Sequence, residues 1–455
     1  MRRSWVCALL LTLLAVGFWP PGLHGQAPGT TPTDLLVERL KSPNVGQRAQ
    51  AARELGKLGD ASVVPALAAA LTDSSEKVRR EVVVALASLP APESLDALIS
   101  ATRDQDAKVR VLAVQGLTAY YTGETPSTGF TGFVQRTWRR AKGRFVEENV
   151  RIDPGVKVEP KVVSALIETM NDTRAIEVSR KAANGLGILV AEAAVPDLVK
   201  AANSADTDLA VEALNALAKI KDKSAGPQLV NLLDSGDKEV KQEAAVTLGV
   251  LRTTEVLSKL QAMFENNPDL ATREKALEGL AYLGSPVSSS LFVKALFSAE
   301  KSFRTFAAEG LARSGDKNAL PELERAVPAE KDAEARLAMQ YAITALGKAD
   351  YLSAVVAELG SKLRGNSAQA YLVELARDSS FLPRLYPFMN SQDSGVRRRL
   401  CTVLTFTGDA TSVDHLEHLS HDANDDVATE AARALRAVRL RVPPSPSSAP
   451  TGGRL

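Results

Sequence analysis

Apolar residues recur along this chain with the period of an α-helix. One face of the segment 76–89, EKVRREVVVALASL, is apolar at helical spacing: Val78, Val82, Val83, Leu86 and Leu89. The segment before it, SVVPALAAALTD at 62–73, has another apolar face and carries Pro65 in its first turn, where the missing amide donor costs little. Asp73 and Ser74 supply turn and N-cap chemistry between the two. The pattern predicts a helical hairpin.

This hairpin pattern repeats along the chain every 31 or 32 residues in most units. The position of Arg79 is basic in eight units, at Arg48, Arg79, Arg110, Lys241, Arg273, Arg304, Arg336 and Arg397. Seven positions after this basic residue comes an apolar residue, usually Leu. Six positions before it comes a small polar residue in most units. Glycines near the expected ends of second helices, Gly59, Gly284, Gly315 and Gly347, suit a left-handed cap. Three registers that move together predict a stack of hairpins that bury each other's faces.

The predicted fold is all-α: a right-handed α-solenoid of about twelve helical hairpins, with the second helices lining the concave side. Repeats 1–3 span 33–123 and repeats 4–12 span 159–440, with the unit at 351–380 the weakest match. An insertion at 124–158 interrupts the period, and the Pro-, Ser- and Gly-rich tail at 441–455 is predicted to be disordered.

The repeated motif resembles HEAT repeats, in particular the short bacterial type named after phycobilisome lyases. The residues that carry the resemblance are Pro65, Leu67, Asp73, Val78-Arg79 and Leu86, and the motif recurs at Asp104 with Val109-Arg110 and at Val396-Arg397. The resemblance covers nearly all of 33–440. It implies a solenoid and a structural ladder in which arginines bond to turn groups of their own or the next repeat. The residues assigned to this ladder are Asp73, Arg79, Asp104, Arg110, Arg304, Arg336 and Arg397. The rival interpretation is a row of exposed cations in the groove.

The start of the chain predicts export. Arg2 and Arg3 precede the apolar run VCALLLTLLAVGFW at 6–19, which is short for a membrane span and typical of a signal peptide covering 1–25. An uncleaved anchor is the alternative. The protein is then periplasmic or secreted. Of the two cysteines, Cys7 lies in the leader, so the mature chain keeps Cys401 alone on an apolar helix face and forms no internal disulfide.

The insertion concentrates basic and aromatic residues. Phe130, Val134, Trp138, Ala141 and Phe145 fall on one side of a helix expected at 133–148. The candidate binding residues there are Phe133, Arg136, Trp138, Arg139, Arg140, Lys142, Arg144 and Phe145. Three interpretations stay open: capping of the third repeat with solvated arginines, docking of an acidic protein, and contact with a membrane surface through 130–145.

Composition and motifs point away from several functions. The net charge of +1 and 24% charged residues give no reason to expect nucleic acid. The chain has no Gly-rich phosphate loop, no Gly-x-Ser-x-Gly and no Cys-x-x-Cys. His415, His418 and His421 are spaced by three and drift around a helix, which favours a surface cluster over a metal site. Family members that hold two irons use His-Glu dipeptides, and this chain has none. We expect no cofactor and no enzyme activity.

The favoured function is non-catalytic protein binding, as a scaffold or adaptor in the cell envelope or outside the cell. The alternatives are an enzyme-associated HEAT protein, lyase-like or metal-dependent, and a membrane-surface binder. Candidate groove residues on second helices are Arg80, Gln115, Glu278, Tyr282, Glu309, Arg313, Arg398, Arg399 and Phe406. The partner is expected to be another protein.

Overall fold

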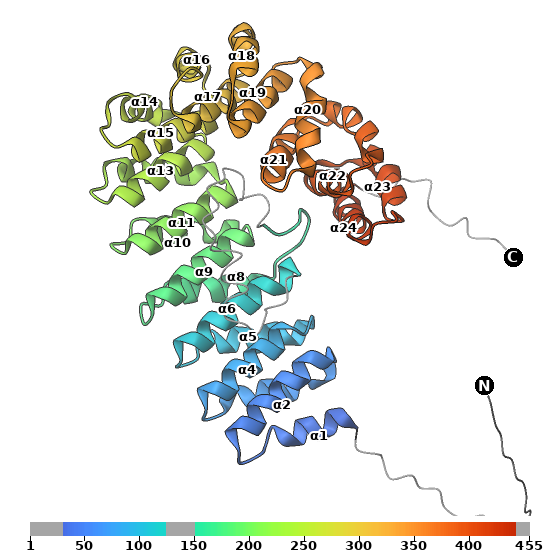
Figure 1. Ribbon diagram of the computed structural model, residues 1–455. Helices are drawn as coiled ribbons and strands as arrows, with labels where there is room; N and C mark the ends of the chain where they lie inside the picture. The colour runs from blue at the N-terminus through green and yellow to red at the C-terminus, as the bar shows by residue number, and fades with distance from the viewer. Residues whose placement is uncertain (1–30, 124–150, 443–455) are drawn as a thin grey trace, which may run out of the picture.

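The computed structural model describes residues 31–123 and 151–442, and these form an arch of stacked helical hairpins (Figure 1). Twelve pairs of elements follow one another, as the repeat register predicts, and the described residues contain helices and no strands. The all-α solenoid prediction is therefore confirmed. In Figure 1 the stack runs upward from α1 to α18 and then turns, so that α21 to α24 return toward the middle of the chain.

The first helix of each pair is short and packs on the second. These helices are α1 Pro32–Arg39, α3 Val64–Ala69, α5 Pro92–Ala101, α8 Pro160–Met170, α10 Val195–Ala202, α12 Gly226–Leu229, α14 Leu257–Asn266, α16 Ser289–Ala295, α18 Leu320–Ala326, α20 Leu352–Ala357 and α23 Val413–Leu419. In the eleventh pair two 3₁₀ helices, Ser379–Arg384 and Tyr386–Asn390, replace the α-helix. Pro383 lies inside the first of them and lacks the amide proton that an α-helix would use.

The second helices are longer. They are α2 Val45–Leu58, α4 Glu76–Ala87, α6 Ala107–Thr122, α9 Ile176–Ile188, α11 Thr207–Ile220, α13 Lys238–Val250, α15 Leu270–Leu283, α17 Lys301–Ser314, α19 Ala333–Ala345, α21 Gly365–Leu375, α22 Ser394–Thr407 and α24 Asp425–Arg441. Gly59, Gly284, Gly315 and Gly347 all have positive φ at their ends, as predicted. The N-cap prediction around Asp73 needs one correction, because Ser75 is the N-cap of α4 and Asp73 instead accepts the Ser75 amide in the turn before it.

One continuous apolar core runs through the stack. Each repeat contributes fully buried residues such as Leu55, Leu86 and Leu117, which share one position in the repeat register. Small residues allow neighbouring second helices to approach closely. A Cβ placed on Gly249 would lie 2.2 Å from the carbonyl oxygen of Gly279, and one on Gly279 would lie as near to that of Ala245. Glycine and alanine at these positions therefore permit tight helix stacking.

Cys401 lies in this core, as the sequence predicts. Its side chain is fully buried on α22, and burial raises the pKa of its thiol to about 12. Because the thiolate is the reactive form, we expect maleimide to leave Cys401 unmodified in the native protein and to modify it after denaturation in guanidinium. Peptide mapping after both treatments measures this. Fast modification of the native protein would show that α22 opens readily.

Candidate functional site

Arginine and carboxylate side chains link successive repeats along the turns. The Arg79 guanidinium donates to both oxygens of Asp104 in the next repeat, at 2.7 and 3.0 Å, and to the Asp73 carbonyl at 2.8 Å. Asp104 in turn accepts the amide of Asp106, two residues along its own turn. Each arginine therefore fixes the turn of its own repeat and holds the turn that follows.

The same geometry recurs at other arginines of this register, though not at all of them. Arg48 pairs with Asp73, Arg397 with Asp422 and Arg304 with Glu330. The paired arginines are shielded from solvent, as the ladder interpretation requires, and they are not free cations in a groove.

Arg336 and Arg110 depart from the predicted ladder. Arg336 is exposed, and its side chain has no partner among the described residues. The position 25 residues further on is Ser361, which offers no carboxylate. Arg110 donates to the carbonyls of Asp104 and Gln105, but its Nε is buried without a hydrogen-bond partner in the described part of the chain. The residue 25 positions after Arg110, where the paired carboxylate would be expected, falls in the insertion.

The ladder makes folding sensitive to acid. The hydrogen bonds from Arg48 and Arg397 lower the pKa of Asp73 and Asp422 below the usual 3.8. A folded carboxylate with a lowered pKa binds protons more weakly than the unfolded one, so its stabilisation is present above about pH 4 and is lost as pH falls. We expect the thermal midpoint, followed by circular dichroism, to drop between pH 5 and pH 2. Asp422→Asn should flatten this dependence, and an unchanged profile would contradict the assignment.

The inner face of repeats 1–5 carries half-buried polar side chains on second helices. Two of the predicted groove residues, Arg80 on α4 and Gln115 on α6, lie on this accessible stretch and are partly exposed. Polar contacts join adjacent second helices at residues 28 positions apart. Arg53 pairs with Glu81 at 2.6 Å, and the Asn184 amide donates to Glu212 at 3.2 Å.

Three other predicted groove residues are wrong as contact residues, because the structure buries them. Glu278 is 6% exposed and accepts from Lys275 at 2.8 Å, while Glu309 is fully buried on α17. The Arg313 side chain is 3% exposed and donates to both oxygens of Glu374 on α21, at 2.8 and 3.0 Å. The arch is bent so strongly here that α17 meets α21, two repeats further on.

A polar cluster fills this bend, and we call it the bend cluster: Glu309, Arg313, Tyr341, Tyr371 and Glu374. Tyr371 donates to Glu309 at 2.7 Å, and the Tyr341 and Tyr371 rings stack with centroids 4.3 Å apart. Burial raises the pKa of Tyr341 far above its usual value. Burial opposes ionisation of Glu374, but Arg313 outweighs it and lowers the pKa of that carboxyl.

The remaining predicted groove residues lie around and beyond the bend. Tyr282 has the Arg313 guanidinium over its ring, 4.6 Å from the centroid. Arg399 donates to the Leu359 carbonyl at 2.6 Å, and burial lowers its pKa. Arg398 and Phe406 are partly exposed on α22. Of these residues, Phe406 faces a cavity.

A contact between segments distant in sequence closes the arch. Residues 151–158, which we call the strap, form the end of the insertion, lead into α8 and lie between repeat 4 and the last repeats. Asp153 accepts two hydrogen bonds from Arg433 on α24, at 2.5 and 2.8 Å, across 280 residues of sequence. Leu440 at the end of α24 packs beside Gly155. The backbone of Ile152 donates to the Ile188 carbonyl at 3.0 Å, which fixes the strap on repeat 4.

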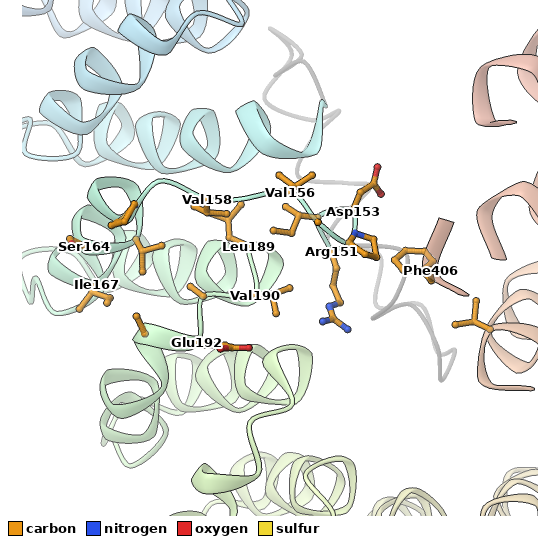
Figure 2. Close-up of a pocket in the computed structure, with 18 of the residues that line it drawn as sticks. Arg151, Asp153, Val156, Val158, Ser164, Ile167, Leu189, Val190, Glu192 and Phe406 are labelled. Carbon is orange, nitrogen blue, oxygen red and sulfur yellow. The ribbon is translucent and has the colours of Figure 1, made fainter. Parts of the chain in front are cut away.

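This closure forms a partly open cavity of about 710 Å³ between the strap, α8, the turn after α9, and the helices α21 and α22. Figure 2 shows Val156, Val158 and Leu189 on one side and Phe406 on the other. The strap was predicted only as the end of the insertion. The predicted helix at 133–148, and with it Phe133, Arg136, Trp138, Arg139, Arg140, Lys142, Arg144 and Phe145, lies outside the described residues.

The histidine cluster has an ordinary surface environment. The His415 ring stacks on Tyr386 with centroids 4.1 Å apart, and His421 Nδ1 lies 3.0 Å from the Glu417 carbonyl. Across 31–123 and 151–442, no group of three or more His, Cys, Asp or Glu side chains is placed to hold a metal ion. Within the same ranges no helix has the length and apolarity needed to cross a bilayer.

Comparison with known proteins defines the class of protein. The model of the HEAT repeat family matches residues 33–118, 195–281, 264–344 and 343–436, which is more than half of the chain. The chain therefore belongs to the HEAT repeat family, whose scaffold is typical of protein-binding proteins. No curated protein matches the sequence.

Solved structures that resemble this chain do so at low sequence identity. An engineered protein matches at 20% identity over 89% of this chain and 98% of its own, with a TM-score of 0.38. The Escherichia coli protein YibA matches at 19% identity over 69% of this chain and 92% of its own, with a TM-score of 0.39. Importin beta matches at 13% identity over 89% of this chain and 64% of its own, with a TM-score of 0.42. These likenesses concern the fold.

Proposed function

We propose that this chain is a non-catalytic protein-binding scaffold, and that its partner lies along the inner face of repeats 1–5. One observation carries the proposal. The residues five positions after the ladder arginine form a row on successive second helices, and in this half of the arch most of them are polar and partly or fully exposed. They are Arg53, Val84, Gln115, Asn184 and Asn215. In the bend the same register position is occupied by Glu278, Glu309 and Tyr341, which are buried.

The chemistry of this row suits a polypeptide better than a polyanion. Amide side chains can donate to and accept from a peptide backbone, and two carboxylates adjoin the row, Glu81 at Arg53 and Glu212 at Asn184. A nucleic acid would be repelled by these carboxylates. A stable protein interface buries about 1,600 Å² in total, and a row that crosses five repeats spans enough surface for it.

The leader supports a location outside the cytoplasm, which is the second part of the proposal. A charged start followed by a short apolar run at 6–19 is typical of a signal peptide, so the scaffold would act in the periplasm or outside the cell. Fractionation of cells with an antibody to this protein tests the location. Finding the protein in the cytoplasm with residues 1–25 still attached would reject this part alone.

Substitutions in the row test the binding surface. Gln115→Arg with Asn215→Arg places two long cations in the row without touching the buried core. The matched control, Gln228→Arg with Asn231→Arg, makes the same changes at exposed positions of a first-helix segment. We expect at least one protein captured from the source cells to be retained by the wild type and the control and lost from the row variant, as quantified by mass spectrometry. Equal capture by all three would contradict the proposal.

A further inference from the structure

The cavity under the strap is separate from the inner-face row, and most of its lining is apolar. Its walls come from Ile152, Val156 and Val158 of the strap, Val163 and Ile167 of α8, and Phe406 of α22. A volume of about 710 Å³ lies within the roughly 300–1,000 Å³ typical of small-molecule sites. The space is partly open to solvent, so a ligand can enter it, and covering its apolar walls with an apolar body is favourable.

The cavity exists only because the arch is closed. Its two walls belong to repeat 4 and to repeats 10 and 11. The ion pair between Asp153 and Arg433 holds the strap on α24 of repeat 12, which packs on α22 of repeat 11. Leu440 beside Gly155 adds an apolar contact to the same closure. A molecule that touches both walls at once would bind the closed arch more tightly than an open one, and would therefore stabilise closure.

Val190, which lines the cavity, has a strained backbone. Its φ is +51°, a left-handed conformation that β-branched residues rarely adopt. At the ends of other second helices the positive-φ residues are Gly59, Gly123, Gly284, Gly315 and Gly347, or the unbranched Lys221 and Arg252. A glycine at 190 would relieve the strain. Val190 instead combines a strained backbone with a place on the cavity wall, and such strain is concentrated at functional sites.

The charged groups at the cavity favour an anionic head on an apolar body. Figure 2 shows the Arg151 side chain between Val190 and Phe406, and Arg377 lines the side formed by α21. Among the described residues two carboxylates also line the cavity, and Arg377 additionally lies close enough to Glu374 to help lower the pKa of that carboxyl. Asp153 is bonded through both oxygens to Arg433, and Glu192 is exposed. We propose that this cavity binds a small amphiphile with a hydrocarbon body and a carboxylate head, held by Arg151 and Arg377, and that binding locks the arch closed.

Titration of the full-length protein with sodium dodecanoate, kept below its micelle concentration, tests the proposal by isothermal calorimetry. We expect one saturable site. Dodecanol, which has the same body without the charge, should bind at least tenfold more weakly. The double variant Arg151→Gln/Arg377→Gln should lose this preference for dodecanoate. Absence of saturable dodecanoate binding, or equal binding of dodecanol by the wild type, would overturn the proposal.

Two more variants separate a ligand site from a packing defect. Val190→Gly should leave the thermal midpoint unchanged or raised, because the strain is relieved, and should weaken dodecanoate binding several-fold. Arg433→Gln, which changes no cavity-lining residue, should also weaken binding, since the arch opens more easily. Arg325→Gln, on the exposed surface of α18, is the matched control and should bind as the wild type does. Wild-type affinity in both Val190→Gly and Arg433→Gln would overturn the proposal. The inner-face scaffold function could still hold in that case.

Discussion

Replacing Arg313 with alanine should lower the free energy of unfolding by about 3–5 kcal/mol, the cost of removing one partner from a buried ion pair. The Arg313 side chain is 3% exposed, and it is the cation next to the Glu309 and Glu374 carboxylates. Without it, the fully buried Glu309 loses its neighbouring cation, and Glu374, whose side chain is 21% exposed, loses both hydrogen bonds from Arg313. The carboxylates must then become protonated, or the bend must open locally to admit water. Each of these changes costs free energy.

Urea denaturation followed by circular dichroism measures this loss, and hydrogen exchange locates it. Because solenoid repeats contact mainly their neighbours, we expect faster exchange in α17, α19 and α21 and little change in α2 to α6. Arg325→Ala is the control. Arg325 is 67% exposed on the adjacent α18 and pairs with Glu322, so its loss should cost less than about 1 kcal/mol. Equal losses in the two variants would show that the bend cluster contributes little to stability.

The repeat register predicts much of the fold because the information is local. Leu55, Leu86 and Leu117 recur at one position, and each needs only the adjacent hairpin to be buried. The ladder is local in the same sense. An arginine reaches a carboxylate about 25 residues on, so the absence of an acid at Ser361 already argues against Arg336.

The candidate sites depend on the curvature of the arch, which cannot be read from the spacing of the repeats in the sequence. Gln115 and Glu309 occupy the same position of their repeats, yet one is partly exposed and the other is fully buried. Glu309 is buried because the arch bends sharply at α17, where α17 contacts α21. Gln115 lies on a straighter part of the arch (Figure 1) and, among the described residues, has no such neighbour two repeats further on. Tyr341 and Glu374 are visible in the sequence as polar residues on second helices, but nothing local links Glu374 to Arg313 across 61 residues.

Closure of the arch is still harder to infer from sequence. Asp153 lies in a segment outside the repeat pattern, and its partner Arg433 is 280 residues away in the last repeat. Val190 gives no signal either, since the left-handed position is filled by Gly, Lys or Arg elsewhere. The closure is a consequence of assembling the whole superhelix, whereas the positive φ of Val190 belongs to the local turn after α9.

The ladder itself should account for a second large effect, which a pair of matched variants isolates. Arg79→Ala removes three hydrogen bonds and leaves Asp104 buried without its cation, so we expect a loss of about 3–5 kcal/mol in the free energy of unfolding. Arg336→Ala makes the same change at the same position of another repeat, where the arginine is exposed, and should change that free energy by no more than about 0.5 kcal/mol.

A double-mutant cycle then separates the ion pair from the packing of the arginine stem. If the charge left on Asp104 causes most of the loss, Arg79→Ala with Asp104→Ala should be less destabilised than the sum of the two single variants. The expected coupling exceeds 1 kcal/mol, because both side chains are shielded from water and joined by two bonds. Additive effects would mean that Arg79 acts through its hydrocarbon stem and the Asp73 carbonyl, and that each repeat is stabilised from within instead of through the next one.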